Sequence, residues 1–256
     1  MELDRRLARG NGARWRVPTV WLPPALQRPG AVPDATVRAT TSAAPARGVH
    51  RTSEHLHAQP SAELPVRLRE LRRSDGASWR AFRIADEHLL RPVEPTVATS
   101  WEEAHSPKMW RQTYRGLKFA ERQGVAMSLA IEVAGEFAGQ LTLGNMQYGT
   151  IGNCWIGYWV HSRWQGRGVA TAAVALGTDL AMLGLGLHRV EATVMEDNPA
   201  SRRVLDNTGY RVEGRLERNL HIDGQWTDHL LVAQTVEELG PGITQRLASQ
   251  GRFRVD

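Results

Sequence analysis

Cysteine is almost absent from this chain, since Cys154 is the single cysteine among 256 residues. One thiol cannot form a disulfide within the chain, which excludes a disulfide-stapled fold and suits a reducing compartment. Cys154 lies in a run of β-branched and aromatic residues, so we interpret it as a core thiol in preference to a nucleophile. No stretch approaches the roughly 20 apolar residues that a membrane span requires. We therefore expect a cytoplasmic protein with no membrane partner.

Clustered metal ligands are also lacking. His55 and His57 have no cysteine or carboxylate cluster beside them, and we interpret His188, His221 and His229 as structural residues. No serine nucleophile elbow is present, and no Walker-type lysine follows a glycine-rich loop. We expect no metal cofactor, no phosphate-transferring P-loop and no hydrolase triad of the elbow type.

Positive charge is concentrated at the start of the chain. The net charge is +5, and residues 1–64 contribute +4 of it through nine arginines and five acidic residues. This segment also holds seven of the 13 prolines and shows no sustained hydrophobic periodicity. It predicts a disordered basic arm, which is either a solvated tail or a weak tether to RNA or an acidic partner. The remaining body is almost neutral, so we expect no general nucleic-acid binding by it.

Residues 65–238 alternate between strand and helix patterns and form the predicted domain, while residues 239–256 are expected to be a polar C-terminal tail. A tight turn at 134–136 predicts a hairpin. The order of the elements predicts an α/β protein whose mixed sheet carries helices on both faces. The predicted strands cover 66–71, 127–133, 137–143, 153–161, 188–194, 210–218 and 228–236, and the predicted helices cover 74–88, 100–122, 169–183 and 198–208.

A glycine-rich turn, Trp164–Thr171, joins one of these strands to the next helix. Gly166 and Gly168 allow the backbone to approach a ligand without interference from a Cβ atom. The first amides of a helix lack internal partners, and the helix dipole favours an anion there. The turn therefore fits a pyrophosphate, although such a turn taken alone is explained equally well as an ordinary helix start.

Further motifs accompany the turn. The segment from Gln165 to Ala170 reads Gln-x-x-Gly-x-Ala, and a Leu-His-Arg-Val-Glu-Ala strand follows it. After that strand come Asn-x-x-Ser-Arg from Asn198, Leu-x-x-x-Gly-Tyr, and Ile-Asp-Gly-Gln-Trp-x-Asp-His from Ile222. Together they resemble the GNAT N-acetyltransferase family, and within it the RimJ/RimL group of ribosomal-protein alanine N-acetyltransferases. The resemblance extends over roughly Val66 to Glu238. It implies the GNAT fold, a twisted mixed sheet flanked by helices, and acetyl-CoA as the acetyl donor.

The resemblance also implies a set of residues that hold acetyl-CoA. In the family, the strand before the turn separates from its neighbour, and its free backbone groups bind the pantetheine arm while the turn binds the pyrophosphate. Asn198 matches a residue that contacts the pantetheine, and it also suits a plain helix cap. The matching positions are Trp159, Val160, His161, Gln165, Gly166, Arg167, Gly168, Val169, Ala170, Thr171, Asn198 and Ser201.

Catalytic roles follow from the same resemblance. Many members use a tyrosine as general acid, and Leu205 occupies that position here, which excludes the mechanism in that form. Ser201 matches the serine proposed to protonate the departing thiolate, and it is also an ordinary first-turn serine. The glutamate base of a related branch corresponds to Thr193 here, so Glu191, two residues earlier on the same strand face, is the candidate base through a water molecule, with pairing to an arginine as the alternative. Glu94 is a candidate for acceptor recognition, in a loop where Val93 replaces the usual tryptophan of the group.

The resemblance implies acetyl transfer from acetyl-CoA to a primary amine in one ternary complex, and we expect the N-terminal alanine of a ribosomal or other protein as the acceptor. Acetylation of a small amine or antibiotic is a second hypothesis. A non-catalytic CoA-binding module is a third, because the usual tyrosine is missing. A monomer and a homodimer are both compatible with the sequence.

Overall fold

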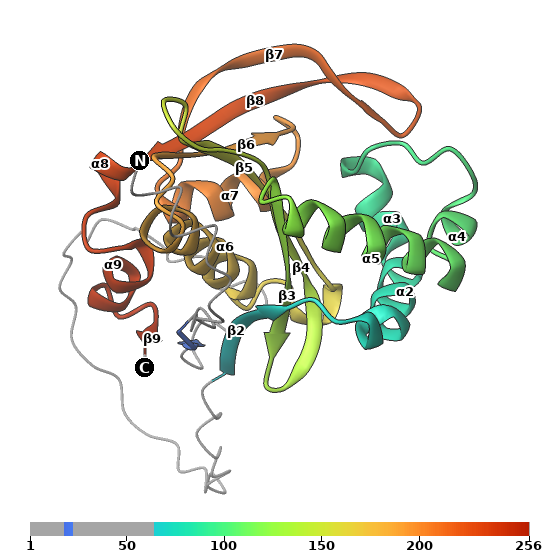
Figure 1. Ribbon diagram of the computed structural model, residues 1–256, viewed down its shortest axis with the longest axis horizontal. Helices are drawn as coiled ribbons and strands as arrows, with labels where there is room; N and C mark the ends of the chain where they lie inside the picture. Colours follow the sequence, from blue (N-terminus) through green and yellow to red (C-terminus); the bar gives the residue numbers. More distant parts are fainter. Residues whose placement is uncertain (1–17, 23–63, 256) are drawn as a thin grey trace, which may run out of the picture.

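The computed structural model describes residues 18–22 and 64–255, which build a nine-stranded sheet in the order β7-β8-β6-β5-β4-β3-β2-β1-β9 (Figure 1). β5 and β6 are parallel, and the other neighbouring strands are antiparallel. The strands are β1 Val20–Leu22, β2 Leu64–Glu70, β3 Ala126–Val133, β4 Glu136–Gln147, β5 Asn153–Val160, β6 Arg189–Val194, β7 Arg211–Ile222, β8 Gln225–Thr235 and β9 Arg254–Val255.

Helices cover both faces of this sheet, as the order of the elements predicts (Figure 1). α6 packs on β2, β4 and β5 together with α7 and α9, and α2 and α5 lie against β3 and β4 on the other face. The helices are α2 Gly76–Ala85, α3 Glu87–Leu90, α4 Trp101–Ala104, α5 Pro107–Arg122, α6 Val169–Asp179, α7 Pro199–Thr208, α8 Val236–Leu239 and α9 Ile243–Ser249, with 3₁₀ turns at Arg73–Asp75, Arg91–Val93 and Ser162–Trp164 and a π-helical turn at Leu180–Gly184.

Two apolar cores lie on the two faces of the sheet. The larger core surrounds α6, which is buried along most of its length because it is covered by the sheet, α7 and α9. The smaller core joins α2 and α5 to the sheet through Trp79, Trp110 and Phe137. None of the helices in the described ranges is long and apolar enough to cross a membrane.

The C-terminal segment is not the polar tail that we expected for 239–256. Leu239, Ile243 and Leu247 recur at intervals of four and are all buried, so they form the inner face of a short helical unit. The Asp179 carboxylate accepts hydrogen bonds from the backbone N–H groups of Ile243 and Thr244, at 2.7 and 3.0 Å, and fixes the start of α9. The apolar spacing was present in the sequence, but polar neighbours obscured it.

The arm predicted for residues 1–64 falls mostly outside the described residues. Within it, however, Val20–Leu22 forms β1, which pairs with β2 on one side and β9 on the other. Val20 is fully buried between these strands. This part of the segment therefore belongs to the folded body, and a strand of three residues was too short for periodicity to reveal.

The β7–β8 hairpin is longer than predicted and extends to a two-residue turn at Asp223-Gly224. Both turn residues have positive φ, which suits a tight hairpin and glycine at the second position. Figure 1 shows the hairpin extending over the molecule toward the region of α3 and α4. Its tip is fastened there, because Arg91 donates to Asp223 at 2.7 Å and the Gly224 N–H donates to Thr96 at 2.9 Å.

Candidate active site

The parallel strands β5 and β6 separate after a short stretch of pairing. Asn153, Cys154 and Trp155 of β5 pair with Arg189, Val190 and Glu191 of β6, and no later pair joins these two strands in the described chain. β5 continues along β4 as far as Val160, while β6 continues along β8. The two strands therefore leave a wedge-shaped opening in the sheet, which we call the splay.

Peptide groups of β5 face the splay at every second residue. The His161 N–H donates to Ala138 of β4 at 2.9 Å. Since peptide groups alternate in direction along a strand, the N–H groups of Tyr158 and Val160 point away from β4 and toward the splay. Trp159, Val160 and His161 were predicted to hold a ligand. Of these, Val160 directs its backbone N–H toward the splay, whereas Trp159 and His161 direct theirs toward β4.

The glycine-rich turn closes one end of the splay. Gly166 has φ of 69° and Gly168 has φ of 80°, conformations that L-residues with a side chain rarely adopt. Gly168 is the N-cap of α6, and no side chain caps that helix end, so its first amides keep their capacity to donate to an anion. Gln165 ties the turn to β5, because its side-chain amide donates to the Val160 carbonyl at 2.9 Å. Arg167 is half-buried beside Trp164.

The start of α7 faces the splay from the α6 side of the sheet. Asn198 caps α7 by accepting a hydrogen bond from the Ser201 N–H at 3.1 Å. The Ser201 hydroxyl lies 3.0 Å from the hydroxyl of Tyr158, which comes from β5 across the opening. Leu205, one turn further along α7, is buried in the apolar core, so its position offers no acid. The contact with Tyr158 spans 43 residues and left no signal in the sequence.

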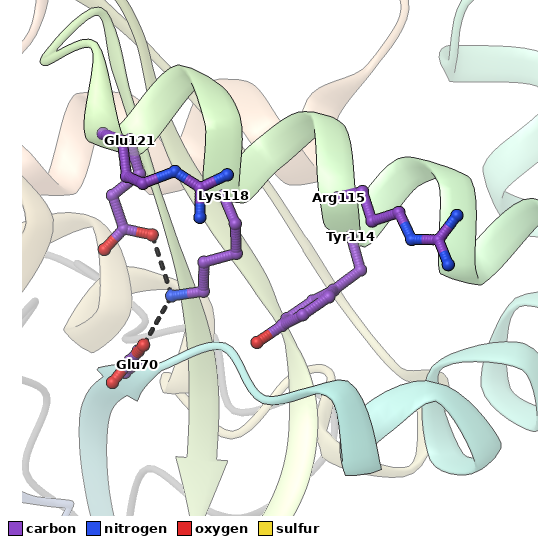
Figure 2. A pocket seen from close by; sticks show the side chains of 6 residues that line it. Glu70, Tyr114, Arg115, Lys118 and Glu121 are labelled. Carbon is purple, nitrogen blue, oxygen red and sulfur yellow. Dashed lines mark hydrogen bonds and ion pairs between the residues drawn. The ribbon is translucent and has the colours of Figure 1, made fainter.

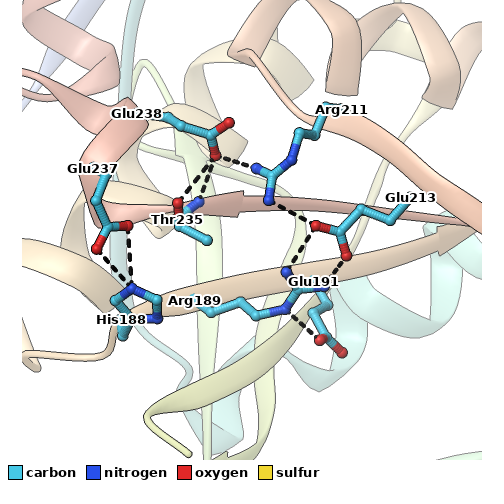
Figure 3. A network of polar contacts seen from close by, with 8 residues as sticks. All are labelled: His188, Arg189, Glu191, Arg211, Glu213, Thr235, Glu237 and Glu238. Carbon is cyan, nitrogen blue, oxygen red and sulfur yellow. Dashed lines mark hydrogen bonds and ion pairs between the residues drawn. The ribbon is translucent and has the colours of Figure 1, made fainter.

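Glu191 lies at the base of the splay and is held by an arginine, which was the alternative left open for it (Figure 3). Arg189 Nε donates to the Glu191 carboxylate at 2.6 Å, and the same guanidinium binds Glu213 of β7. The hydrogen bonds that Arg189 donates to Glu213 and Glu191 raise its pKa above the ordinary value, against an opposing effect of burial. Glu191 is thus a half-buried carboxylate with a permanent cationic neighbour.

A histidine–aspartate pair stands at the end of β5, and the sequence did not indicate it. His161 Nδ1 lies 2.6 Å from the Asp86 carboxylate, which also accepts the Ser162 N–H at 2.7 Å. Burial alone raises the pKa of Asp86, but these hydrogen bonds outweigh burial and lower it, so the carboxylate stays charged. With Nδ1–H donated to Asp86, Nε2 is the nitrogen that can accept a proton. The imidazole also stacks on Phe82, with 4.0 Å between ring centroids.

Glu94 lies in the loop after α3 and forms an ion pair with Arg83 of α2. The Arg83 guanidinium is enclosed by three indole rings at 5.2 to 5.4 Å from their centroids, within cation–π distance. One of them, Trp159, belongs to β5, so this cluster connects Glu94 to the strand that borders the splay. The other two rings are those of Trp79 and Trp101.

Cys154 is a free, buried cysteine, and burial raises the pKa of its thiol to about 12. A thiol of that pKa supplies almost no thiolate near neutrality, which supports its interpretation as a core residue. In the described ranges, no group of three or more His, Cys, Asp or Glu side chains gathers into a cluster that could hold a metal ion.

A separate hollow lies on α5 against β2, away from the splay (Figure 2). Its cationic centre, Lys118, is already bound by Glu70 at 2.6 Å and by Glu121 at 2.8 Å. Because the central cation of this hollow is already paired within the protein, the splay is the better candidate for an active site. Its lining residues are Glu70, Tyr114, Arg115, Lys118, Glu121 and Arg122.

Comparison with known proteins agrees with this geometry. The family model described as "Acetyltransferase (GNAT) domain" matches residues 66–211. The solved structure "Mycobacterium smegmatis RimJ in complex with CoA-disulfide" is 44% identical, with a TM-score of 0.72, and the match covers 75% of this chain and 91% of that chain. The ribosomal protein uS5-alanine N-acetyltransferase of Escherichia coli is 30% identical over 170 residues, which are 63% of this chain and 86% of that protein.

A third relative, "Probable N-acetyltransferase YjcK" of Bacillus subtilis, is 39% identical over 95 residues, or 37% of this chain and 52% of that protein. The family match covers more than half of the chain and includes the splay, the glycine-rich turn and the start of α7. The predicted GNAT fold is confirmed, and this chain belongs to the GNAT acetyltransferase family, as an N-acetyltransferase of the RimJ/RimL type.

Proposed function

We propose that this enzyme transfers the acetyl group of acetyl-CoA to the N-terminal amine of a protein, with the N-terminal alanine of a ribosomal protein as the preferred acceptor. The observation that carries the proposal is the splay. This opening is bordered by peptide N–H groups of β5 and is closed at one end by the start of α6, which no side chain caps. The names of the relatives support it, since one acetylates an alanine of ribosomal protein uS5 and another was solved with a CoA disulfide.

The site fits acetyl-CoA in two places. The amides of the turn from Gly166 to Thr171 are available for the pyrophosphate, and positive φ at both glycines shapes that cradle. The N–H groups of Tyr158 and Val160 face the splay, where they can bind the extended pantetheine arm and the thioester oxygen. When bound there, acetyl-CoA supplies an activated acetyl group, and the peptide groups of β5 orient it.

The acceptor is expected to approach from the face that carries Trp159 and Glu94. The tip of the β7–β8 hairpin is held beside the loop that carries Glu94, by Arg91 and Thr96. Glu94 can attract a terminal ammonium group, because a carboxylate binds ammonium by a charge-assisted hydrogen bond. Arg83 fixes that carboxylate in one orientation.

Charge balance favours a protein N terminus over a polyamine or an aminoglycoside. Polycationic acceptors require several carboxylates without cationic partners around the site, whereas Arg83 offsets part of the charge of Glu94 and Arg189 part of that of Glu191. A singly charged N terminus needs only one carboxylate. We expect this reaction to take place in the cytoplasm, where newly made proteins and acetyl-CoA are both present.

An intact-mass assay tests this proposal. The full chain is incubated with acetyl-CoA and peptides that begin with Ala, Ser or Met, beside polyamines and aminoglycosides, and an N-formylated peptide is the blocked control. The proposal expects one acetyl group on the alanine peptide and none on the blocked peptide. A gain on small amines alone would move the assignment to metabolite or drug acetylation. Bound acetyl-CoA without any transfer would leave a non-catalytic module.

A further inference from the structure

Tyr158 has two separate contacts with the splay. Its backbone N–H faces the opening from β5, while its side chain crosses to the start of α7 and places its hydroxyl 3.0 Å from Ser201 Oγ. The same hydroxyl lies 3.4 Å from the Ser201 carbonyl oxygen. Ser201 is thus held from two sides, because Asn198 accepts its N–H at 3.1 Å.

Either hydroxyl can be the donor in this hydrogen bond, and a phenol that keeps its proton is able to donate. Burial raises the pKa of Tyr158, and the hydrogen bond to Ser201 lowers it by less, so the phenol keeps its proton at physiological pH. A protonated phenol that donates to Ser201 Oγ leaves the single proton of Ser201 free for a third group. It also polarises the serine hydroxyl, since hydrogen bonds in a chain strengthen one another.

A serine in the first turns of a helix often turns back to a nearby backbone group. Here the contact with the phenol restricts the rotation of the serine hydroxyl. Leu205 offers no hydroxyl from the next turn of α7. Among the residues that the structure describes, Tyr158 is the side chain in position to orient the Ser201 hydroxyl.

We propose that Tyr158 is a positioning residue that aims the Ser201 hydroxyl at the departing sulfur of CoA. This inference rests on the proposed acetyl transfer. In that step the amine nitrogen forms a bond to the thioester carbon, the carbon–sulfur bond breaks, and its electron pair goes to sulfur. The nitrogen loses its proton to the base, and the Ser201 O–H stabilises the thiolate by a hydrogen bond. The Tyr158 hydroxyl takes no proton and touches no reacting atom.

A second tyrosine provides a matched control. The buried Tyr210 hydroxyl lies 2.7 Å from Thr178 Oγ1, and burial raises the pKa of this phenol as well. Thr178 is nine residues beyond Val169 on α6, about 13 Å along the helix from the glycine-rich turn. Tyr210→Phe therefore removes a comparable buried phenol–hydroxyl bond whose partner lies on α6 and not at the start of α7.

The test compares Tyr158→Phe, Ser201→Ala, the double variant and Tyr210→Phe. Tyr158→Phe is expected to lower kcat about tenfold with the KM for acetyl-CoA changed less than about twofold, because a donor to the leaving group acts mainly in the transition state. Adding it to Ser201→Ala should have no further effect, and Tyr210→Phe should leave kcat unchanged. Thermal unfolding of each variant confirms that it is folded.

Each outcome has a distinct meaning. Normal kcat in Tyr158→Phe beside an impaired Ser201→Ala overturns the positioning role and leaves the proposed function standing. Equal losses of kcat in Tyr158→Phe and Tyr210→Phe would mean that Tyr158 acts on the stability of the fold and does not position Ser201. Normal kcat in Ser201→Ala overturns both roles at this serine. A wild-type enzyme that acetylates no acceptor overturns the proposed function itself.

A second readout needs no turnover. The ultraviolet absorbance of the thiolate, followed against pH, gives the pKa of the thiol of bound CoA. The positioning role predicts a lower thiol pKa on the wild-type enzyme than on Tyr158→Phe or Ser201→Ala, and no difference between the wild type and Tyr210→Phe. The same thiol pKa on the wild type and on Tyr158→Phe would overturn the inference.

Discussion

Trp155 and Glu191 form the last pair between β5 and β6, at the point where the two strands part. The Trp155 ring lies across Gly144 and Gly157, and a Cβ atom at Gly144 would collide with it. The base of the splay is therefore made by one indole ring and one carboxylate on the same face of the sheet. This pair marks where the pairing between β5 and β6 ends and the proposed binding site begins.

The glycine-rich turn predicts a specific loss of acetyl-CoA binding. Gly168→Ala adds a Cβ atom at a residue with φ of 80°, and Gly186→Ala does so at φ of 71° in a turn with open space around it. Both changes should cost about 1–2 kcal/mol of stability through backbone strain. Calorimetric titration should show that Gly168→Ala weakens acetyl-CoA binding at least about tenfold, while Gly186→Ala does not. Equal affinities for the two variants would show that the turn does not bind the cofactor.

The proton that the acceptor ammonium loses is expected to pass to Glu191 through a water molecule. Glu191→Gln should lower kcat roughly 100-fold, within the range of general-base contributions. Glu213→Gln is the matched control, because Glu213 binds the same Arg189 but lies on β7. A large loss in His161→Gln together with normal kcat in Glu191→Gln would assign the base to the His161–Asp86 pair instead.

Acceptor recognition by Glu94 predicts a selective change in KM. Glu94→Gln should raise the KM for an alanine-starting peptide about tenfold and leave the KM for acetyl-CoA unchanged, because in this account the carboxylate contacts the acceptor and not acetyl-CoA. Glu102 of α4 is an exposed partner of Arg80, which lies on the same helix as Arg83, the partner of Glu94. Glu102→Gln should therefore change neither KM. Steady-state kinetics with each substrate varied in turn measure the effect. If the peptide KM stays normal in Glu94→Gln, the acceptor is recognised elsewhere.

His105 predicts how stability depends on pH. Burial, with a further contribution from the Arg83 charge, lowers the pKa of this imidazole to about 4, although its hydrogen bond to the Trp101 carbonyl opposes the shift. Between that pKa and the unfolded value near 6.5, the unfolded chain binds a proton that the folded chain does not, so stability falls as pH is lowered. The loss from about pH 7 to about pH 5 should be about 2 kcal/mol.

The variant His105→Phe keeps a ring beside Trp79 and Trp101 but cannot titrate. Urea unfolding should therefore show a smaller difference in unfolding free energy between the two pH values for this variant than for the wild type. Parallel pH dependence in the two proteins would mean that His105 does not contribute.

Local signals in the sequence were sufficient to predict the glycine-rich turn and the capped start of α7. Gly168 and Asn198 act through their own backbone neighbourhood, so their roles as helix caps follow from a few adjacent residues. Contacts between distant segments could not be read in this way. Asp86 meets His161 across 75 residues and Tyr158 meets Ser201 across 43, and both distances depend on how α2 and α7 pack on the sheet.

Pairing of charges was also beyond the sequence. Glu94 and Glu191 were identified as candidate carboxylates, and pairing with an arginine was the alternative for Glu191, but the sequence did not show which arginines bind them. These partners decide how much charge the site presents. Arg83 precedes Glu94 by 11 residues on a different element, and only the fold places it among three indole rings. The acceptor class therefore depends on tertiary contacts more than on motifs.

The most direct test of the account locates the acetyl group on a peptide that offers two amines. A peptide that begins with alanine and carries an internal lysine is incubated with the enzyme and acetyl-CoA, and fragmentation by mass spectrometry assigns the modified nitrogen. The account predicts a single acetyl group on the N-terminal amine and none on the lysine. Acetylation of the lysine side chain, or no acetylation of this peptide at all, would contradict it.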